Sequence, residues 1–188
     1  RAMKRPIRIM AISGGGHVDQ SMHLHLAKSV GADRVLAKPF LPKDFLQEVM
    51  RLTTEAGYKN YLETNGTLFF ELRDVIEQVH IVAMDLKLSS STGMGNLWWM
   101  HRKFLQIASR KEVFLKAIIC ETTADNDFSE ALGLIKEVLP GSVLVLQPNN
   151  FQYGALLAEK LIHYRKLGQS QGVEVRVIPQ MHKDWEVK

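Results

Sequence analysis

Short runs of apolar and β-branched residues alternate with stretches of helical period along almost the whole chain, and this alternation limits the possible fold more than any other feature. Most of the apolar runs are bounded by Gly, Pro, Asn or Ser, as expected of strands. Runs that are apolar almost throughout are typical of strands buried on both faces, which occur in parallel sheets. The sequence therefore predicts βα units arranged around a parallel sheet.

The pattern predicts strands over residues 7–12, 34–37, 60–63, 81–86, 113–119, 142–146 and 173–178. It predicts helices over residues 23–30, 42–56, 69–78, 97–109, 128–138 and 155–168. This amounts to about six βα units and a closing strand in a single α/β domain of residues 1–188. The pattern does not separate a partial (βα) barrel of the TIM type from an open, doubly wound, flavodoxin-like sheet.

In both architectures the functional residues gather at the carboxyl ends of the strands, where loops and helix N-termini converge. Candidate ligand-binding residues at these ends are Ser13, Gly14, Gly15, Lys38, Thr64, Asn65, Gly66, Asp85, Lys87 and Gln147. The Ser13 loop is rich in glycine and lies between a predicted strand and helix, an arrangement in which backbone N–H groups bind anions. A flexible turn without a ligand is the alternative, because the Lys-Ser/Thr pair of a P-loop is missing.

Asp85 and Lys87 are two residues apart where the predicted strand 81–86 ends, so their side chains are expected on the same face, where they form an ion pair. This ion pair either binds a ligand or is an internal salt bridge that only orders the ends of the strands. Thr64, Asn65 and Gly66 either line the same site or form an ordinary turn, since Asn-Gly is a common turn signal.

The composition excludes several classes of function. The formal net charge is only +4 and no basic block is interleaved with aromatic residues, so we expect no nucleic-acid partner. No apolar run approaches the roughly 18 residues of a membrane helix, and no leader opens the chain, so a cytoplasmic protein is expected. Cys120 is the one cysteine, which excludes a disulfide framework and a metal site built from several thiolates of this chain.

From Leu62 onward the chain closely resembles radical SAM enzymes of the 7-carboxy-7-deazaguanine synthase family. The strings that carry the resemblance are Leu-Glu-Thr-Asn-Gly-Thr at 62–67, Ala-Met-Asp-Leu-Lys-Leu-Ser-Ser-Ser at 83–91, residues 101–105 and 111–116, Leu-Gln-Pro at 146–148, and Arg-Val-Ile-Pro-Gln with His-Lys at 176–183. The resemblance implies a partial (βα) barrel that uses SAM and a [4Fe–4S] cluster. It also implies that the strings around Asn65 and Asp85 line the SAM and substrate site and that Gln147 helps to hold SAM.

The first part of the chain resembles the C-terminal half of a response-regulator receiver domain, with Gly-Ala-Asp at 31–33 and Lys-Pro-Phe at 38–40. We therefore divide the chain into a receiver-like segment of residues 1–56 and a radical SAM-like barrel segment of residues 57–188. The resemblance implies that Ser13 and Lys38 bind phosphate, sulfate or another small anion, and that a cis peptide precedes Pro39. The acidic pair and the phosphoacceptor aspartate of receivers are absent from the sequence.

The radical SAM resemblance has a gap of its own, because the three-cysteine loop and the Gly-Gly-Glu-Pro string of that family are also absent. Our first hypothesis is an engineered or recombined chimera with no cofactor, no metal, no catalytic residue and no intact activity. One alternative is a natural 7-carboxy-7-deazaguanine synthase relative that lacks its cluster-binding N-terminal part, and another is a signalling module. An incomplete sheet has an unpaired edge, so a homodimer through that edge is also expected.

Overall fold

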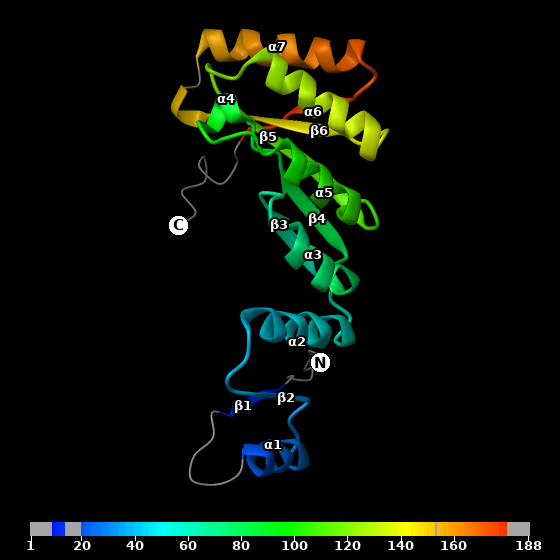
Figure 1. Ribbon diagram of the computed structural model, residues 1–188. Helices are drawn as coiled ribbons and strands as arrows, with labels where there is room; N and C mark the ends of the chain where they lie inside the picture. The colour runs from blue at the N-terminus through cyan, green and yellow to red at the C-terminus, as the bar shows by residue number, and fades with distance from the viewer. Residues whose placement is uncertain (1–8, 14–19, 153, 180–188) are drawn as a thin grey trace, which may run out of the picture. The chain divides into compact units, whose positions relative to one another are not determined.

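The computed structural model describes residues 9–13, 20–152 and 154–179 (Figure 1). The chain divides into two compact units. The first comprises residues Arg1–Asn60 and Glu77–Val79, and the second comprises Tyr61–Ile76 and His80–Lys188.

The first unit contains two parallel strands and two helices: β1 (Met10–Ser13), α1 (Gln20–Ser29), β2 (Arg34–Ala37) and α2 (Pro42–Glu55). Pro42 suits the first turn of α2, where a backbone N–H has no partner within the helix. Asp44 caps the same end, because its carboxylate accepts the Leu41 N–H at 3.1 Å. The expected cis peptide between Lys38 and Pro39 is confirmed.

The second unit is built on a five-stranded parallel sheet of order β3-β4-β5-β6-β7. Its strands are β3 (Tyr61–Thr64), β4 (Ile81–Asp85), β5 (Glu112–Ile119), β6 (Leu144–Pro148) and β7 (Val175–Val177). Its helices are α3 (Phe69–Val75), α4 (Ser89–Thr92), α5 (Trp98–Ala108), α6 (Asp125–Val138) and α7 (Ala155–Ser170). Two 3-10 turns are also present in the described residues, η1 (Ile76–Gln78) after α3 and η2 (Asn150–Gln152) after β6. Each strand pairs with its neighbour in sequence, whereas the strand order of a doubly wound sheet reverses. The predicted partial parallel βα fold is confirmed.

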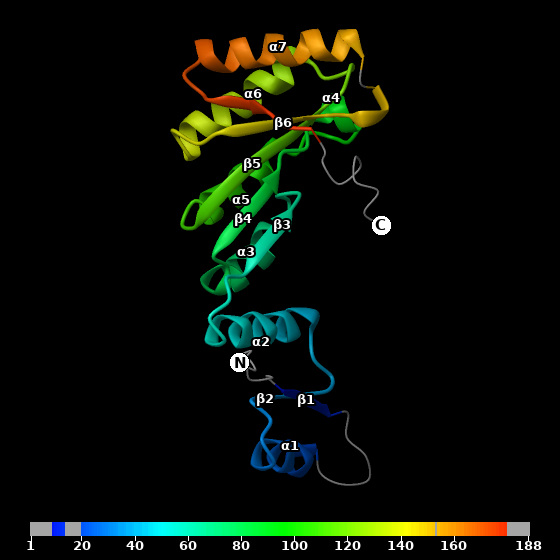
Figure 2. The ribbon, with the colours of Figure 1, turned by 180° about the vertical axis from the view of Figure 1, so that it is seen from behind.

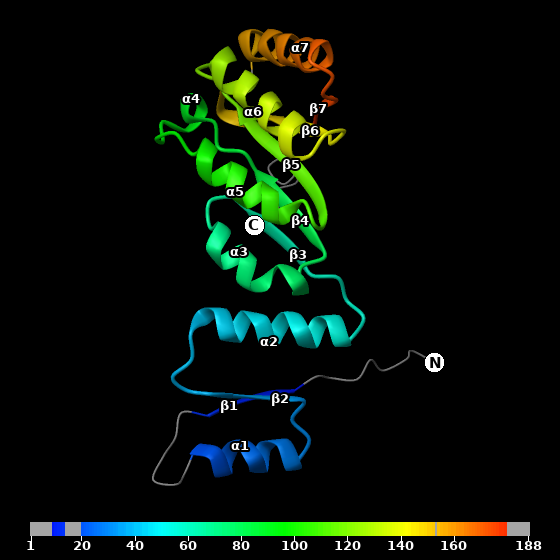
Figure 3. The same ribbon diagram turned by 45° about the vertical axis from the view of Figure 1, so that its right-hand side comes forward.

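The long helices of the second unit cover one face of its sheet. Helices α3, α5 and α6 lie in front of the strands in Figure 1 and behind them in Figure 2, and the view of Figure 3 separates the two layers. The core lies between these layers. Leu115, Ala117 and Ile119 of β5 are buried there, while the alternating Phe114 and Lys116 belong to the opposite face.

Aromatic packing closes the core beneath α6 and α7. The Phe128 and Tyr164 rings are both fully buried and stack with centroids 4.2 Å apart. The Tyr164 hydroxyl donates to the Thr123 carbonyl at 2.8 Å, so this buried polar group is satisfied. Stacked rings and a satisfied hydroxyl together fix the helical layer against the carboxyl end of β5.

All seven predicted strands are present within a few residues of their expected bounds. The strands nevertheless form two separate sheets in the described residues, β1-β2 and β3 to β7. The short elements α4 and η2 were not predicted, because they carry no apolar period. Among the described helices, none combines the length and the apolar character required to cross a bilayer.

Two helical glycines provide a matched test of packing. A Cβ at Gly168 of α7 would lie 2.2 Å from Val175 Cγ2 and 3.2 Å from the Val173 carbonyl oxygen, whereas a Cβ at Gly133 of α6 would meet nothing within 4 Å. We expect Gly168→Ala to lower the free energy of unfolding by about 1–3 kcal/mol. Gly133→Ala should raise it by about 0.5–1 kcal/mol. Chemical denaturation of both variants measures the two values, and equal effects would contradict the close packing of α7 on β7.

Candidate functional site

The turn that follows β3 is ordered by its own side chains. The Thr64 hydroxyl accepts the Gly66 N–H at 3.1 Å, and the Asn65 carboxamide oxygen accepts the Thr67 N–H at 3.3 Å and the Thr67 hydroxyl at 2.8 Å. Gly66 has a φ of +66°, and a Cβ there would lie 2.3 Å from Met84 Cε. The Asn-Gly turn signal is therefore confirmed, and the left-handed backbone at Gly66 favours glycine.

The carboxyl end of β4 carries the predicted ion pair. Lys87 Nζ lies 2.6 Å from Asp85 Oδ2, and the Asp85 side chain is 13% exposed. Asp85 Oδ1 is buried and has no hydrogen-bond partner in the described residues. A buried carboxylate oxygen without a donor is unfavourable by about 1–3 kcal/mol, so this atom is suited to accept a hydrogen bond from a ligand.

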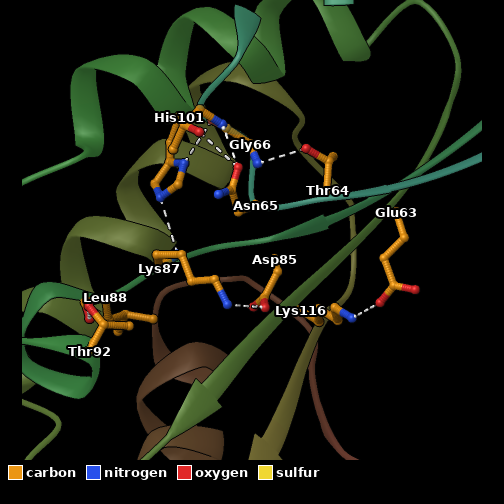
Figure 4. Close-up of polar contacts among 11 residues, drawn as sticks. Glu63, Thr64, Asn65, Gly66, Asp85, Lys87, Leu88, Thr92, His101 and Lys116 are labelled. Atoms are coloured by element: carbon orange, nitrogen blue, oxygen red, sulfur yellow. Dashed lines mark hydrogen bonds and ion pairs between the residues drawn. The ribbon is translucent and has the colours of Figure 1, made fainter. Parts of the chain in front are cut away.

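His101 of α5 joins the β3 turn to the end of β4 (Figure 4). Its side chain is fully buried. Nδ1 lies 3.0 Å from the Gly66 carbonyl oxygen, and Nε2 accepts the Lys87 N–H at 3.1 Å. One imidazole therefore contacts the backbone of both segments that the sequence assigns to the site.

A second ion pair lies on the sheet face opposite the helical layer. Lys116 of β5 forms a hydrogen bond and ion pair with Glu63 of β3 (Figure 4). Burial alone would lower the pKa of Lys116, but the hydrogen bond and charge of Glu63, helped by Asp85, raise it. Lys116 is in register with Asp85, so the two ion pairs are neighbours on one sheet face.

Gln147 belongs to the same face of the sheet, two residues after Val145, which is in register with Lys116. The carboxyl end of β5 beside it carries Cys120, whose thiol is buried. Asn149 Nδ2 donates to Cys120 Sγ at 3.4 Å, and the thiol donates to the Ser91 carbonyl at 3.6 Å. Cys120 is thus packed between the loops that follow β4 and β6.

Asp127 near the start of α6 fastens the loop that contains α4. Its carboxylate accepts the Ser90 N–H at 2.7 Å, the Ser90 hydroxyl at 2.6 Å, the Ser89 hydroxyl at 3.0 Å and Trp98 Nε1–H at 3.4 Å. Burial alone would raise the pKa of Asp127, but these hydrogen bonds outweigh it and lower the pKa. The α4 segment begins two residues after Lys87, so Asp127 stabilises one border of the site.

The N-terminal candidates belong to the first unit. Ser13 ends β1 in register with Ala37 of β2, and Lys38 is exposed directly after β2. Gly14 and Gly15 lie outside the described residues. The predicted anion site of these four residues stays a prediction, whereas the structure brings Thr64, Asn65, Gly66, Asp85 and Lys87 together and sets Gln147 on the sheet face that carries Asp85.

Comparison with known proteins relates most of the chain to one kind of enzyme. The chain is 34% identical over 148 residues to a 7-carboxy-7-deazaguanine synthase of Geobacter sulfurreducens, a match that covers 78% of this chain and 59% of that protein. Over most of its length, this chain is homologous to 7-carboxy-7-deazaguanine synthases. The synthase of Aquifex aeolicus is 30% identical over 156 residues, which cover 80% of this chain and 62% of that protein. The chain thus spans about three fifths of these relatives, and no protein-family model matches it.

This homology corrects the hypothesis of an engineered chimera. The aligned 148 residues are more than the chain contains from Leu62 to Lys188, so the match includes the greater part of α2. That helix lies in the segment assigned to a receiver domain, and no comparison supports the receiver assignment. A natural relative of the deazaguanine synthases accounts for the homology better than a recombined protein.

The expectation of a protein without a cofactor is also wrong. The relatives found are 7-carboxy-7-deazaguanine synthases, the same family that the sequence motifs resemble. The resemblance to that family implies the use of SAM and an iron–sulfur cluster. The residues of this chain do not fit the cluster itself. A cluster held by three thiolates needs three cysteines, and Cys120 is the one cysteine in 188 residues. In the part of the chain that the structure describes, no group of three or more His, Cys, Asp or Glu side chains could hold a metal ion.

The sequence did not reveal the contacts of His101, Asp127, Glu63 or Lys116. His101, Glu63 and Lys116 lie in strings that carry the family resemblance, and Asp127 marks the start of a predicted helix. A signal for His101 was available, because it precedes Phe104, Leu105 and Ala108 at helical spacing on the buried face of α5. A histidine at such a position requires hydrogen-bond partners for its ring nitrogens. The partners of Asp127 lie 29 to 38 residues away in sequence, so no local pattern could reveal them.

Asp127 provides a test of the border of the site. We expect Asp127→Asn to lower the free energy of unfolding near neutral pH by about 1–3 kcal/mol, because an uncharged amide has one acceptor oxygen where the carboxylate uses two for Ser89, Ser90 and Trp98. The lowered pKa of Asp127 means that its stabilisation is complete above about pH 3.8 and is lost as the pH falls further. The difference between wild type and variant should therefore shrink below pH 4. Asp125→Asn, in the same turn of α6, is the control. Its own contact is with exposed His163 at 3.3 Å, so a loss as large as that of Asp127→Asn would contradict a special role of the Ser89 and Ser90 contacts.

Proposed function

We propose that this chain is a natural relative of the 7-carboxy-7-deazaguanine synthases and forms the SAM-binding and substrate-facing part of their active site. Thiolates for a cluster would come from outside these 188 residues, since the chain offers Cys120 alone. The observation that carries the proposal is the partial site at the carboxyl ends of β3 and β4, where Asp85 Oδ1 is buried and has no hydrogen-bond partner among the residues that the structure describes. The homology over 78% of the chain supports the same assignment.

The placement of polar groups supports binding of a SAM-like molecule. The carboxyl ends of parallel strands meet at one edge, which is where open and barrel βα folds bind ligands. At that edge lie the turn that contains Asn65, the ion pair of Asp85 and Lys87, and the carboxamide of Gln147. SAM carries an ammonium, a carboxylate, ribose hydroxyls and an adenine ring, each of which these groups can bind by hydrogen bonds or charge.

The residues of this chain would bind and orient the ligand. Asp85 offers a carboxylate oxygen to an ammonium or hydroxyl, Lys87 offers an ammonium to a carboxylate, and Gln147 offers both a donor and an acceptor. The Glu63 and Lys116 pair extends the polar surface along the sheet face that the helices leave uncovered. SAM, when bound, supplies the adenosyl group for radical chemistry.

Equilibrium dialysis with radiolabelled SAM tests this proposal. We expect saturable binding by the 188-residue chain, weakened about fivefold to tenfold in Asp85→Asn and in Gln147→Ala, because each change removes a hydrogen bond to the ligand. Glu112→Gln is the control, since Glu112 is exposed at the opposite, amino end of β5. Absence of saturable SAM binding by the wild-type chain would overturn the proposal, as would equal losses in all three variants.

A further inference from the structure

The His101 imidazole forms hydrogen bonds to backbone groups through both of its ring nitrogens, and we call this pair of contacts the His101 link. Gly66 O belongs to the turn after β3, and Lys87 N belongs to the segment after β4. The two residues are separated by 21 positions in sequence, and His101 is a further 14 positions along the chain. A buried side chain on a third element therefore sets how these two segments lie relative to each other.

The geometry fixes the tautomer of His101. The Lys87 N–H can only donate, so Nε2 must be unprotonated to accept it. The Gly66 carbonyl can only accept, so the ring proton is on Nδ1. A neutral ring with Nδ1–H satisfies both contacts, and a doubly protonated ring would place Nε2–H against the Lys87 N–H.

We propose that His101 is a positioning residue that holds the Thr64–Gly66 turn and the Asp85–Lys87 segment at a fixed separation, so that a ligand meets both segments already arranged. The ring is rigid and fully buried, which makes it a spacer of constant length. The identity of the ligand as SAM rests on the proposed function, whereas the link between the segments does not.

The surroundings of His101 favour its neutral form. Burial lowers the pKa of His101 below 6.5, the Lys87 ammonium acts in the same direction, and the Gly66 carbonyl and the Asp85 carboxylate act against them. Trp98 packs edge-on against the ring with centroids 5.7 Å apart and adds no charge. The link should therefore be intact at neutral pH and open as the pH falls below 6.5 toward the lowered pKa, beginning at Lys87.

Three substitutions separate the two contacts. His101→Asn places an amide near Nδ1 and can keep the Gly66 contact, His101→Gln reaches toward Nε2 and can keep the Lys87 contact, and His101→Phe keeps neither. In ¹⁵N-labelled chain without ligand, the exchange rate of the Lys87 amide reports one contact and the Thr67 amide shift reports the Gly66 carbonyl. We expect Lys87 exchange to rise at least about tenfold in His101→Asn and His101→Phe but little in His101→Gln. The Thr67 shift should change in His101→Gln and His101→Phe but little in His101→Asn.

SAM dialysis of the same proteins completes the experiment. We expect weaker binding in all three variants, and an affinity of the wild-type chain that falls between pH 7.5 and pH 5.5 more steeply than that of His101→Gln. Unchanged Lys87 exchange and Thr67 shift in folded variants would overturn the inference, as would full SAM affinity in every variant. If His101→Phe does not fold, the Asn and Gln variants decide the result. A wild-type chain that shows the expected amide changes on substitution but binds no SAM would refute the proposed function and leave the positioning role of His101 standing.

Discussion

The buried imidazole of His101 is the contact on which the arrangement of the candidate site depends most. Its two ring nitrogens satisfy backbone groups from the ends of two neighbouring strands, through a buried contact with Gly66 and a part-buried contact with Lys87. Replacing one partner would leave a buried donor or acceptor unsatisfied, at a cost of about 1–3 kcal/mol. The Asn65 turn and the Asp85 and Lys87 pair are therefore held by the core rather than by the surface.

The sheet places its polar residues by the same alternation that builds the core. Along β5, Leu115, Ala117 and Ile119 are buried beneath the helices, and Lys116 between them belongs to the other face. Because parallel strands keep their register, Asp85, Lys116 and Val145 form one row across three strands. With a helical layer on one side and the charged Asp85 and Lys116 on the other, this unit has one face for stability and one face suited to a ligand.

The sequence was sufficient for the strands and for the local chemistry, and less so for contacts between distant segments. Apolar runs predicted every strand, two-residue spacing predicted the Asp85 and Lys87 pair, and Asn-Gly predicted the turn at Gly66. The His101 and Asp127 links join segments far apart in sequence, so they emerge only when the chain is folded. The chimera hypothesis was wrong because residues 1–56 were assigned to a receiver domain, whereas the homology to the synthases continues into α2.

The central claim is that a SAM-like ligand binds at the carboxyl ends of β3, β4 and β6. The most direct measurement is a titration of the ¹⁵N-labelled chain with SAM, followed amide by amide. We expect shift changes concentrated at Thr64 to Gly66, Asp85 to Lys87 and Gln147. Changes concentrated at the amino ends of the strands, around Glu112 and Glu174, or no saturable changes at all, would contradict it.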